Sequence, residues 1–184
     1  MESLPSLSGY VYWLLTDPVT EERVHINMNR LRTKVDFPDF KPHVTLASVI
    51  GQTELTPLQQ IAEQLAQSFA PFRVQSEKIS GEEHPYRCLY IKLKKSRLLL
   101  DIRQMVFRQM NRSEEDAQFY NPHISLVYGT LKKNEKKRLA EEVDFPENTE
   151  IVLNRIAICH VAGTPKDWKI AFQDDLNKGS EIRL

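Results

Sequence analysis

Apolar residues recur along the chain at two spacings, one typical of strands and one typical of helices. The first half predicts strand, helix, strand, helix and strand, and the second half repeats this order. The predicted strands cover about residues 9–16, 42–50, 71–80, 87–94, 122–129 and 149–161. Corresponding elements lie about 80 residues apart, and only a last strand at about 168–173 falls outside the repeat. The pattern therefore predicts an internal duplication of element order.

The helices between these strands are indicated by apolar faces and by residues suited to helix starts. Asp17 is the expected N-cap of the first helix, with Pro18 at its first helical position. The second helix is expected to begin at Thr56, Ser96 to cap the third, and a charged fourth helix to cover about 132–142. The apolar positions assigned to the first three helices are Val24, Met28, Leu31, Val35, Leu58, Ile61, Leu65, Phe69, Leu98, Ile102, Met105 and Val106.

The fold class follows from the way the strands succeed one another. Long strands at 71–94 and 149–173 favour antiparallel neighbours over parallel βαβ winding, so the predicted class is α+β. We expect one domain over 1–184, a bilobal duplicated fold with two mainly antiparallel sheets, outer helices and a central cleft. The lobes are predicted at approximately 9–80 and 87–161, related by a pseudo-twofold axis. Clefts between lobes are favoured places for ligands.

Two copies of one short motif carry the candidate chemistry. The segments Pro42–Leu46 and Pro122–Leu126 both have the pattern Pro-His-apolar-hydroxyl-Leu. Residues two apart on a strand point to the same face, which pairs His43 with Thr45 in one copy. The same spacing pairs His123 with Ser125 in the other. If the two strands lie side by side, two imidazoles and two hydroxyls meet in one small volume.

These residue types suit chemistry on a phosphate. Two imidazoles can divide the roles of general acid and general base near neutral pH. Two hydroxyls can donate hydrogen bonds to the non-bridging oxygens of a phosphate. A single such histidine is readily a structural strand residue, but two complete copies favour catalysis. The pattern therefore predicts His43 and His123 as catalytic residues and Thr45 and Ser125 as substrate-binding residues.

The doubled motif resembles the signature of the 2H phosphoesterase superfamily and, within it, the plant and yeast cyclic phosphodiesterases. The similarity extends to Tyr12-Trp13-Leu14, to the segment from Pro122 to Tyr128, and to Leu153–Cys159 followed by Asp167-Trp168. The resemblance implies a LigT-like fold and hydrolysis of cyclic phosphodiesters without a metal or other cofactor. It also implies His123 as the base and His43 as the acid, with the reverse assignment left open by the pseudo-symmetry.

Two aromatic residues complete the expected substrate-binding set. The position of Tyr128 in the family motif implies that it lines the site and contacts phosphate or base. It lies five residues after His123, which is the wrong parity for the same face of a regular strand. Gly129 follows at once, so the strand is expected to end or bend there and redirect the tyrosine. Trp13 is expected to stack on a nucleobase. The alternative for both is a packed core residue.

The resemblance implies small substrates. These are ADP-ribose 1″,2″-cyclic phosphate, a product of tRNA splicing, and nucleoside 2′,3′-cyclic phosphates that are opened to the 2′-phosphate. The formal net charge is +0, so no bulk attraction to a long polyanion or an anionic membrane is implied. Two alternatives stay open: a 2H enzyme acting on RNA ends or short 2′-5′ oligonucleotides, and a nucleotide-binding module without turnover.

The remaining features concern the surroundings of the protein. Cys88 and Cys159 fall inside predicted strands, where buried thiols are expected rather than a disulfide framework. The sequence has no signal peptide and no apolar run of transmembrane length, and no His, Cys and carboxylate cluster has metal-ligand spacing. We expect a cytoplasmic monomer with a role in RNA metabolism.

Two further expectations concern the surface. The loop 81–87 joins the predicted lobes and is expected to gate the cleft, with His84 exposed to solvent. Two basic runs, at 92–97 and 132–138, are expected to form solvated faces. A run that bordered the cleft would steer an anionic substrate toward it.

Overall fold

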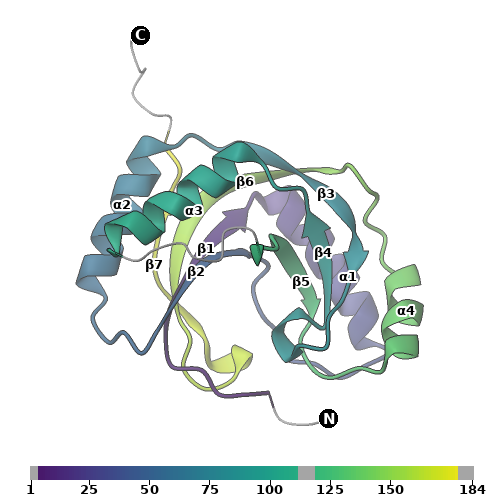
Figure 1. Cartoon of the computed structure of the whole chain (residues 1–184). Coiled ribbons are helices and arrows are strands. Elements are labelled where there is room, and N and C mark those ends of the chain that lie inside the picture. Colours follow the sequence, from purple (N-terminus) through teal and green to yellow (C-terminus); the bar gives the residue numbers. More distant parts are fainter. Residues whose placement is uncertain (1–3, 112–118, 178–184) are drawn as a thin grey trace.

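The computed structural model describes residues 4–111 and 119–177, which form four α-helices and one seven-stranded antiparallel sheet (Figure 1). The strands are β1 (Gly9–Thr16), β2 (Val44–Ile50), β3 (Phe72–Ser80), β4 (Leu89–Leu93), β5 (His123–Val127), β6 (Glu150–His160) and β7 (Lys169–Asp175). The helices are α1 (Pro18–Arg32), α2 (Thr56–Ser68), α3 (Arg97–Gln109) and α4 (Lys133–Glu141). The α+β class and the predicted element order are confirmed.

The local signals for helix starts are confirmed. The side chain of Asp17 accepts a hydrogen bond from the Thr20 amide at 2.8 Å, which satisfies one of the unpaired N–H groups at the start of α1. The Ser96 hydroxyl accepts one from the Leu99 amide at 3.2 Å and caps α3. The helices pack on one face of the sheet through buried residues such as Met28 and Leu65.

The sheet closes on itself through an additional strand pairing. Its strand order is β1-β2-β5-β4-β3-β6-β7, and β1 also pairs with β6. Figure 1 shows the strands at the centre and the helices around the outside of the curved sheet. The expectation of two separate sheets is wrong. The strands join because the third strand of each half pairs with the first strand of the other, β3 with β4 and β6 with β1.

The pairings have an approximate twofold relation. Exchanging β1 with β4, β2 with β5 and β3 with β6 leaves the set of pairings unchanged, while β7 lies outside it on the edge of β6. The pairs β2–β5 and β3–β6 lie on this axis, and β2 meets β5 where Val44 pairs with Ile124. The duplication predicted from element order is therefore present in the sheet.

The two faces of the sheet have different surroundings. The main core lies between the sheet and the helices. A smaller apolar cluster lies on the other face of β1 and β6 and consists of Val11, Trp13, Leu15, Ala157, Cys159 and Val161. Cys88 and Cys159 are free and buried, as expected. This second face carries the candidate active site.

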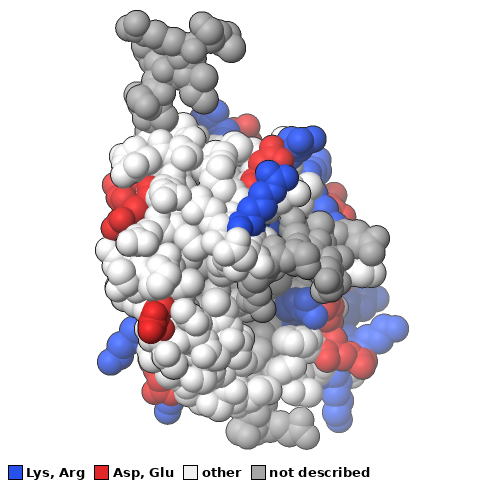
Figure 2. Space-filling view, turned by 60° about the vertical axis from the view of Figure 1, so that its left-hand side comes forward, with Lys and Arg blue, Asp and Glu red and all other residues white. Residues whose placement is uncertain are grey.

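On the face shown in Figure 2, charged side chains of both signs lie mostly toward the edges, around a broad uncharged area. In the view of Figure 2, lysines and arginines of the described residues lie beside aspartates and glutamates. In the first basic run, Lys92 pairs with Glu77 at 2.8 Å and Arg97 with Asp101 at 2.9 Å. Such pairs fit the expected solvated face. No helix within residues 4–111 and 119–177 is both long and apolar enough to span a bilayer.

Candidate active site

The two motif histidines are held in the same way on neighbouring strands. His43 directly precedes β2, and His123 begins β5. The Nδ1 atom of His43 lies 2.7 Å from the carbonyl oxygen of Lys41, and that of His123 lies 2.7 Å from the carbonyl oxygen of Asn121. A carbonyl oxygen only accepts, so each Nδ1 carries the hydrogen and donates. Each neutral ring therefore keeps Nε2 as its acceptor.

A bulge follows the histidine in each copy. In the β1–β2 pairing, Tyr12 pairs with Ala47 and Trp13 with Thr45, which leaves Leu46 as an extra residue on β2. A β-bulge of this kind shifts the alternation of side chains by one residue. Ser48 therefore returns to the face that carries His43 and Thr45.

The same irregularity recurs 80 residues later. Leu89 pairs with Val127 and Tyr90 with Ser125, so Leu126 is the extra residue on β5. The bulge brings Tyr128 to the face of His123, although the two are five residues apart. The sequence-based reason for this placement, a bend at Gly129, is incomplete because the parity changes earlier, at Leu126.

All six predicted site residues line one cavity of about 430 Å³. They are His43, His123, Thr45, Ser125, Tyr128 and Trp13. The cavity is also lined by Pro5, Leu7, Val11, Ser48, Ile50, His84, Pro85, Tyr86, Arg87, Val161 and Trp168. The two halves of the repeat thus contribute one histidine and one hydroxyl each to a common space, as predicted.

Trp13 packs against a histidine. Its ring lies parallel to the imidazole of His43, with centroids 3.7 Å apart and planes at 13°, and the residue is 3% exposed. A nucleobase therefore cannot stack on the face of Trp13 that His43 covers. The expected stacking of a nucleobase on Trp13 stays a prediction, and the burial of the residue fits the alternative of a packed aromatic side chain.

Tyr128 and Ser125 form the other side of the cavity. The ring of Tyr128 stacks on Phe40 with centroids 3.9 Å apart and meets Tyr86 edge-on at 5.4 Å. Burial raises the pKa of its hydroxyl, so Tyr128 is a protonated hydrogen-bond donor over the whole physiological range. The Ser125 hydroxyl donates to the carbonyl of Tyr86 at 3.2 Å.

Burial sets the electrostatics of both imidazoles. Desolvation lowers the pKa of His43 to about 3, a shift that the Lys41 carbonyl opposes and the charge of His123 reinforces. Desolvation also lowers the pKa of His123, opposed by the Asn121 carbonyl and reinforced by Arg87. Both imidazoles are therefore neutral in the unliganded protein at pH 7. A bound anion would supply the negative charge that favours a protonated ring.

Several lining residues have no signal in the sequence. Arg87 is the one lysine or arginine among the described residues that line the cavity, and it pairs with Glu82 at 2.9 Å. Tyr86 and Trp168 add aromatic surface, and the exposed His84 lies at the rim. Trp168 belongs to the segment Asp167-Trp168 that carried part of the family resemblance, whereas no motif marks His84, Tyr86 or Arg87. They reach the cavity only because the segments around Pro85–Arg87 and Pro165–Asp167 fold over β5 and β1.

Hydrogen bonds connect the loop 81–87 to its neighbours, and its expected role as a gate of the cleft stays a prediction. The Gly129 amide donates to the carbonyl of Pro85 at 2.8 Å. The Lys136 ammonium on α4 donates to the carbonyl of Glu82 at 2.6 Å. These bonds, together with the one from Ser125, give the loop a fixed place beside β5.

The residues that the structure describes contain no group of three His, Cys, Asp or Glu side chains placed to hold a metal ion. The titratable groups that face the cavity are instead His43, His123 and His84, with Arg87 and two tyrosines. This set can exchange protons and donate hydrogen bonds to an anion.

Two His-x-Thr/Ser motifs on adjacent strands of a duplicated antiparallel sheet define a 2H phosphoesterase. The chain belongs to the 2′-5′ RNA ligase superfamily, whose family model matches residues 17–164. The resemblance stated from the doubled motif is thereby confirmed. The curated relatives in this class are phosphodiesterases, and the chain is accordingly a hydrolase.

The relatives agree with this assignment. A cyclic phosphodiesterase of Arabidopsis thaliana is 25% identical over 154 residues, which cover 82% of this chain and 83% of that protein. A 2′,3′-cyclic-nucleotide 3′-phosphodiesterase of Phaeosphaeria nodorum is 29% identical over 124 residues, which cover 62% of this chain and 64% of that protein.

Solved structures confirm the LigT-like fold. The protein TT0787 of Thermus thermophilus has a TM-score of 0.64 at 13% identity, over 93% of this chain and 98% of that one. Apo LigT of E. coli has a TM-score of 0.62 at 14% identity, over 95% of this chain and 100% of that one. Both therefore share the fold at low sequence identity.

Proposed function

We propose that this enzyme is a metal-independent cyclic phosphodiesterase acting on small cyclic nucleotides. The substrates are ADP-ribose 1″,2″-cyclic phosphate, nucleoside 2′,3′-cyclic phosphates, or both, the latter opened to 2′-phosphates. The observation that carries the proposal is the matched pair of imidazoles, each anchored through Nδ1, in one cavity with two hydroxyls. The names of the Arabidopsis and Phaeosphaeria relatives support the substrate class.

The proposed mechanism is an in-line attack of water on the cyclic phosphate. Nε2 of His123 takes a proton from the water as its oxygen bonds to phosphorus. The bond from phosphorus to the leaving sugar oxygen breaks, and protonated His43 gives that oxygen its proton. Thr45 donates a hydrogen bond to a non-bridging oxygen as charge accumulates there, and Ser125 does the same after its hydroxyl hydrogen turns from the Tyr86 carbonyl to the phosphate. The products are a phosphomonoester and the two histidines with their protonation states exchanged.

Burial of His43 gives the substrate a part in the mechanism. The acid must be protonated, yet desolvation strongly disfavours the charged form of His43 in the unliganded protein. The negative charge of the bound phosphodiester stabilises an imidazolium beside it. Trp13, stacked on His43, is proposed to hold the ring in place rather than to bind the base.

The pH dependence follows from these shifts. The reaction requires one neutral and one protonated imidazole, and in the free enzyme both pKa values lie below the usual 6.5. The singly protonated form is therefore most abundant below pH 6.5, and kcat/KM is expected to fall as the pH rises above it. The bound anion raises the pKa of the acid, so the optimum of kcat is expected at a higher pH. Full pH–rate profiles of both constants check this, and a kcat/KM optimum above pH 7 would contradict it.

The function itself is tested by turnover and by the position of the product phosphate. EDTA-treated enzyme is incubated with 2′,3′-cyclic AMP and with ADP-ribose 1″,2″-cyclic phosphate, and phosphorus NMR identifies the products. We expect hydrolysis of at least one substrate to a single monoester, with the 2′-phosphate formed from cyclic AMP. If the folded protein hydrolyses neither compound, the proposed function is rejected.

A second cavity favours one alternative, action on RNA ends or short oligonucleotides. This cavity of about 500 Å³ shares Thr45, Ser48, Arg87 and His123 with the first. It continues along Ala47, Arg103, Phe107, Phe119, Tyr120 and Asn121. Guanidinium groups and aromatic rings beside the reacting centre suit a further phosphate and base. A short RNA with a 2′,3′-cyclic phosphate end, added to the same assay, separates the alternatives through the ratio of kcat/KM values.

A further inference from the structure

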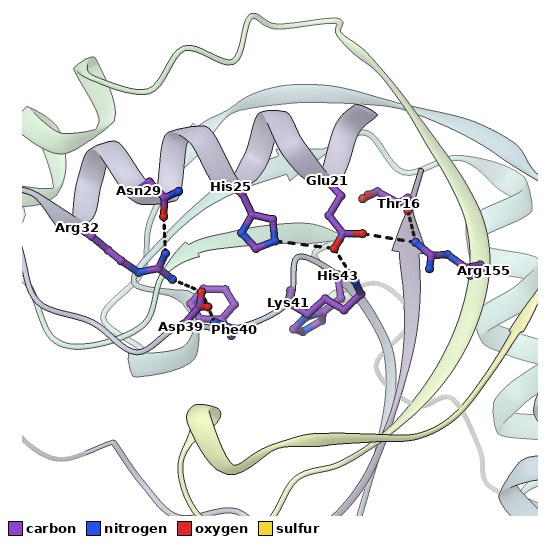
Figure 3. A network of polar contacts seen from close by, with 10 residues as sticks. All are labelled: Thr16, Glu21, His25, Asn29, Arg32, Asp39, Phe40, Lys41, His43 and Arg155. Atoms are coloured by element: carbon purple, nitrogen blue, oxygen red, sulfur yellow. Dashed lines mark hydrogen bonds and ion pairs between the residues drawn. The ribbon is translucent and has the colours of Figure 1, made fainter. Parts of the chain in front are cut away.

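The carbonyl that anchors His43 belongs to a residue that is itself fixed by a carboxylate. Glu21, in the first turn of α1, accepts a hydrogen bond from the Lys41 ammonium at 2.5 Å. The same carboxylate pairs with Arg155 of β6 at 3.4 Å and lies 3.8 Å from His25 (Figure 3). Glu21 therefore ties the segment before β2 to α1 and β6, with Lys41 as the link to His43.

His123 has a matching arrangement in the other half. Its anchor is the carbonyl of Asn121, and the side-chain amide of Asn121 donates to Glu82 at 3.1 Å. Glu82 also accepts from the Tyr90 hydroxyl at 3.0 Å and pairs with Arg87 at 2.9 Å. In each half, the residue whose carbonyl anchors the histidine is thus bound by a glutamate that also pairs with an arginine. The Asn121 amide donates in addition to the Tyr90 hydroxyl, at 3.0 Å.

Duplication does not account for this match. The carbonyls of Lys41 and Asn121 are 80 residues apart, like the histidines they anchor. The two glutamates are not, because Glu21 lies on α1 whereas Glu82 lies in the loop between β3 and β4. Two unrelated parts of the chain therefore supply the same group to equivalent places.

Stability does not account for it either. The Glu21 and Lys41 side chains are 20% and 30% exposed, and Glu82 and Arg87 are 36% and 39% exposed. Ion pairs in partly solvated positions contribute little to folding, because water screens them. The common property of the two carboxylates is instead that both hold the residue whose carbonyl receives Nδ1–H of a motif histidine.

We propose that Glu21 and Glu82 are positioning residues that hold the backbone carbonyls of Lys41 and Asn121 and so fix the tautomer and orientation of His43 and His123. The inference rests on the proposed function for its effect on turnover. Neither glutamate touches the reacting atoms. Each acts through its neighbour on the direction in which Nε2 faces the phosphate.

Kinetics of single variants give the first test. A displacement of about 1 Å in a catalytic group can cost about 10²-fold in rate. We expect Glu21→Ala and Glu82→Ala to lower kcat by about 10–10²-fold with KM changed less than about threefold, and Glu21→Gln, which keeps an acceptor oxygen, to lose less. Asp101→Ala is the control, because it removes an ion pair with Arg97 on α3 that includes no residue of the cavity. If Glu21→Ala and Glu82→Ala both have the same kcat as Asp101→Ala, the proposal is overturned.

Double-variant cycles show whether each glutamate acts through its neighbour. If Glu21 works by holding Lys41, Glu21→Ala should cost little more in a Lys41→Met background, where that hold is already lost. The corresponding cycle joins Glu82→Ala with Asn121→Ala. Full additivity in both cycles would overturn the proposed route. For Glu82 it would indicate that the effect passes through Arg87 instead.

A measurement on the unliganded protein separates this inference from the proposed function. Long-range ¹⁵N–¹H NMR correlations of histidine rings report which nitrogen carries the hydrogen. The wild-type protein is expected to show Nδ1–H for both histidines. Glu21→Ala should alter the pattern of His43 alone, and Glu82→Ala that of His123 alone. Unchanged tautomers in both variants would reject the positioning role, whether or not any cyclic phosphate is hydrolysed.

Discussion

Alanine in place of His43 or His123 is expected to lower kcat for a cyclic nucleotide by about 10²–10⁴-fold, the range of one general acid or base. The reason is that in the proposed mechanism each imidazole supplies one of two proton transfers, and no other side chain described at the cavity stands in an equivalent anchored position. Steady-state kinetics give the size of the loss, and circular dichroism shows whether the variants are folded.

The control for this experiment is His160→Ala, which removes an exposed histidine at the end of β6. It should retain the kcat of the wild type. The double variant of His43 and His123 should lose little more than the worse single variant, because two groups acting in one step are not additive. Near-normal turnover by His43→Ala would refute two-histidine catalysis.

Truncating Trp13 to alanine is expected to destabilise the protein by about 3–5 kcal/mol, as is usual for large buried aromatic residues. Trp13 is 3% exposed and belongs to the smaller apolar cluster on one face of β1 and β6, so its removal leaves a cavity. The same change uncovers one face of the His43 ring and should lower kcat. Urea denaturation gives the free energy of unfolding, and kinetics under fully folded conditions give the second effect.

Trp13→Phe tests the cause, since it preserves a ring that can stack on His43. We expect it to recover most of the stability and most of kcat. If Trp13→Ala leaves the free energy of unfolding unchanged and raises KM strongly, the packing role is contradicted. That result would favour the base-stacking role that the sequence predicts for Trp13.

Much of the site could be predicted because its signals are local. His43 and Thr45 lie two residues apart in one strand, and their shared face follows from strand geometry alone. The N-caps at Asp17 and Ser96 likewise depend on a few neighbouring residues. Repetition at a constant offset then added the second histidine and hydroxyl and the pseudo-twofold relation.

The rest depends on contacts between distant segments. The bulges at Leu46 and Leu126 occupy ordinary apolar positions, and only the register with β1 and β4 reveals them. The partner of Trp13 depends on how β1 lies against the start of β2. Arg87 reaches the cavity through a loop whose sequence has no motif. The two expected sheets form one sheet because β3 pairs with β4 and β6 pairs with β1. The alternation of apolar and polar residues does not show which strands pair.

The third strand of each half, β3 or β6, pairs with the first strand of the other half. The architecture is therefore that of two subunits fused end to end. A half-length chain would expose the strand edges that β3 and β6 now cover, and two such chains would complete each other around a true twofold axis. In a symmetric dimer both imidazoles would have identical surroundings, and only the bound substrate could make one of them the acid and the other the base. In the fused chain the surroundings differ before any substrate binds: the indole of Trp13 lies parallel to His43, whereas the phenol ring of Tyr90 lies tilted beside His123.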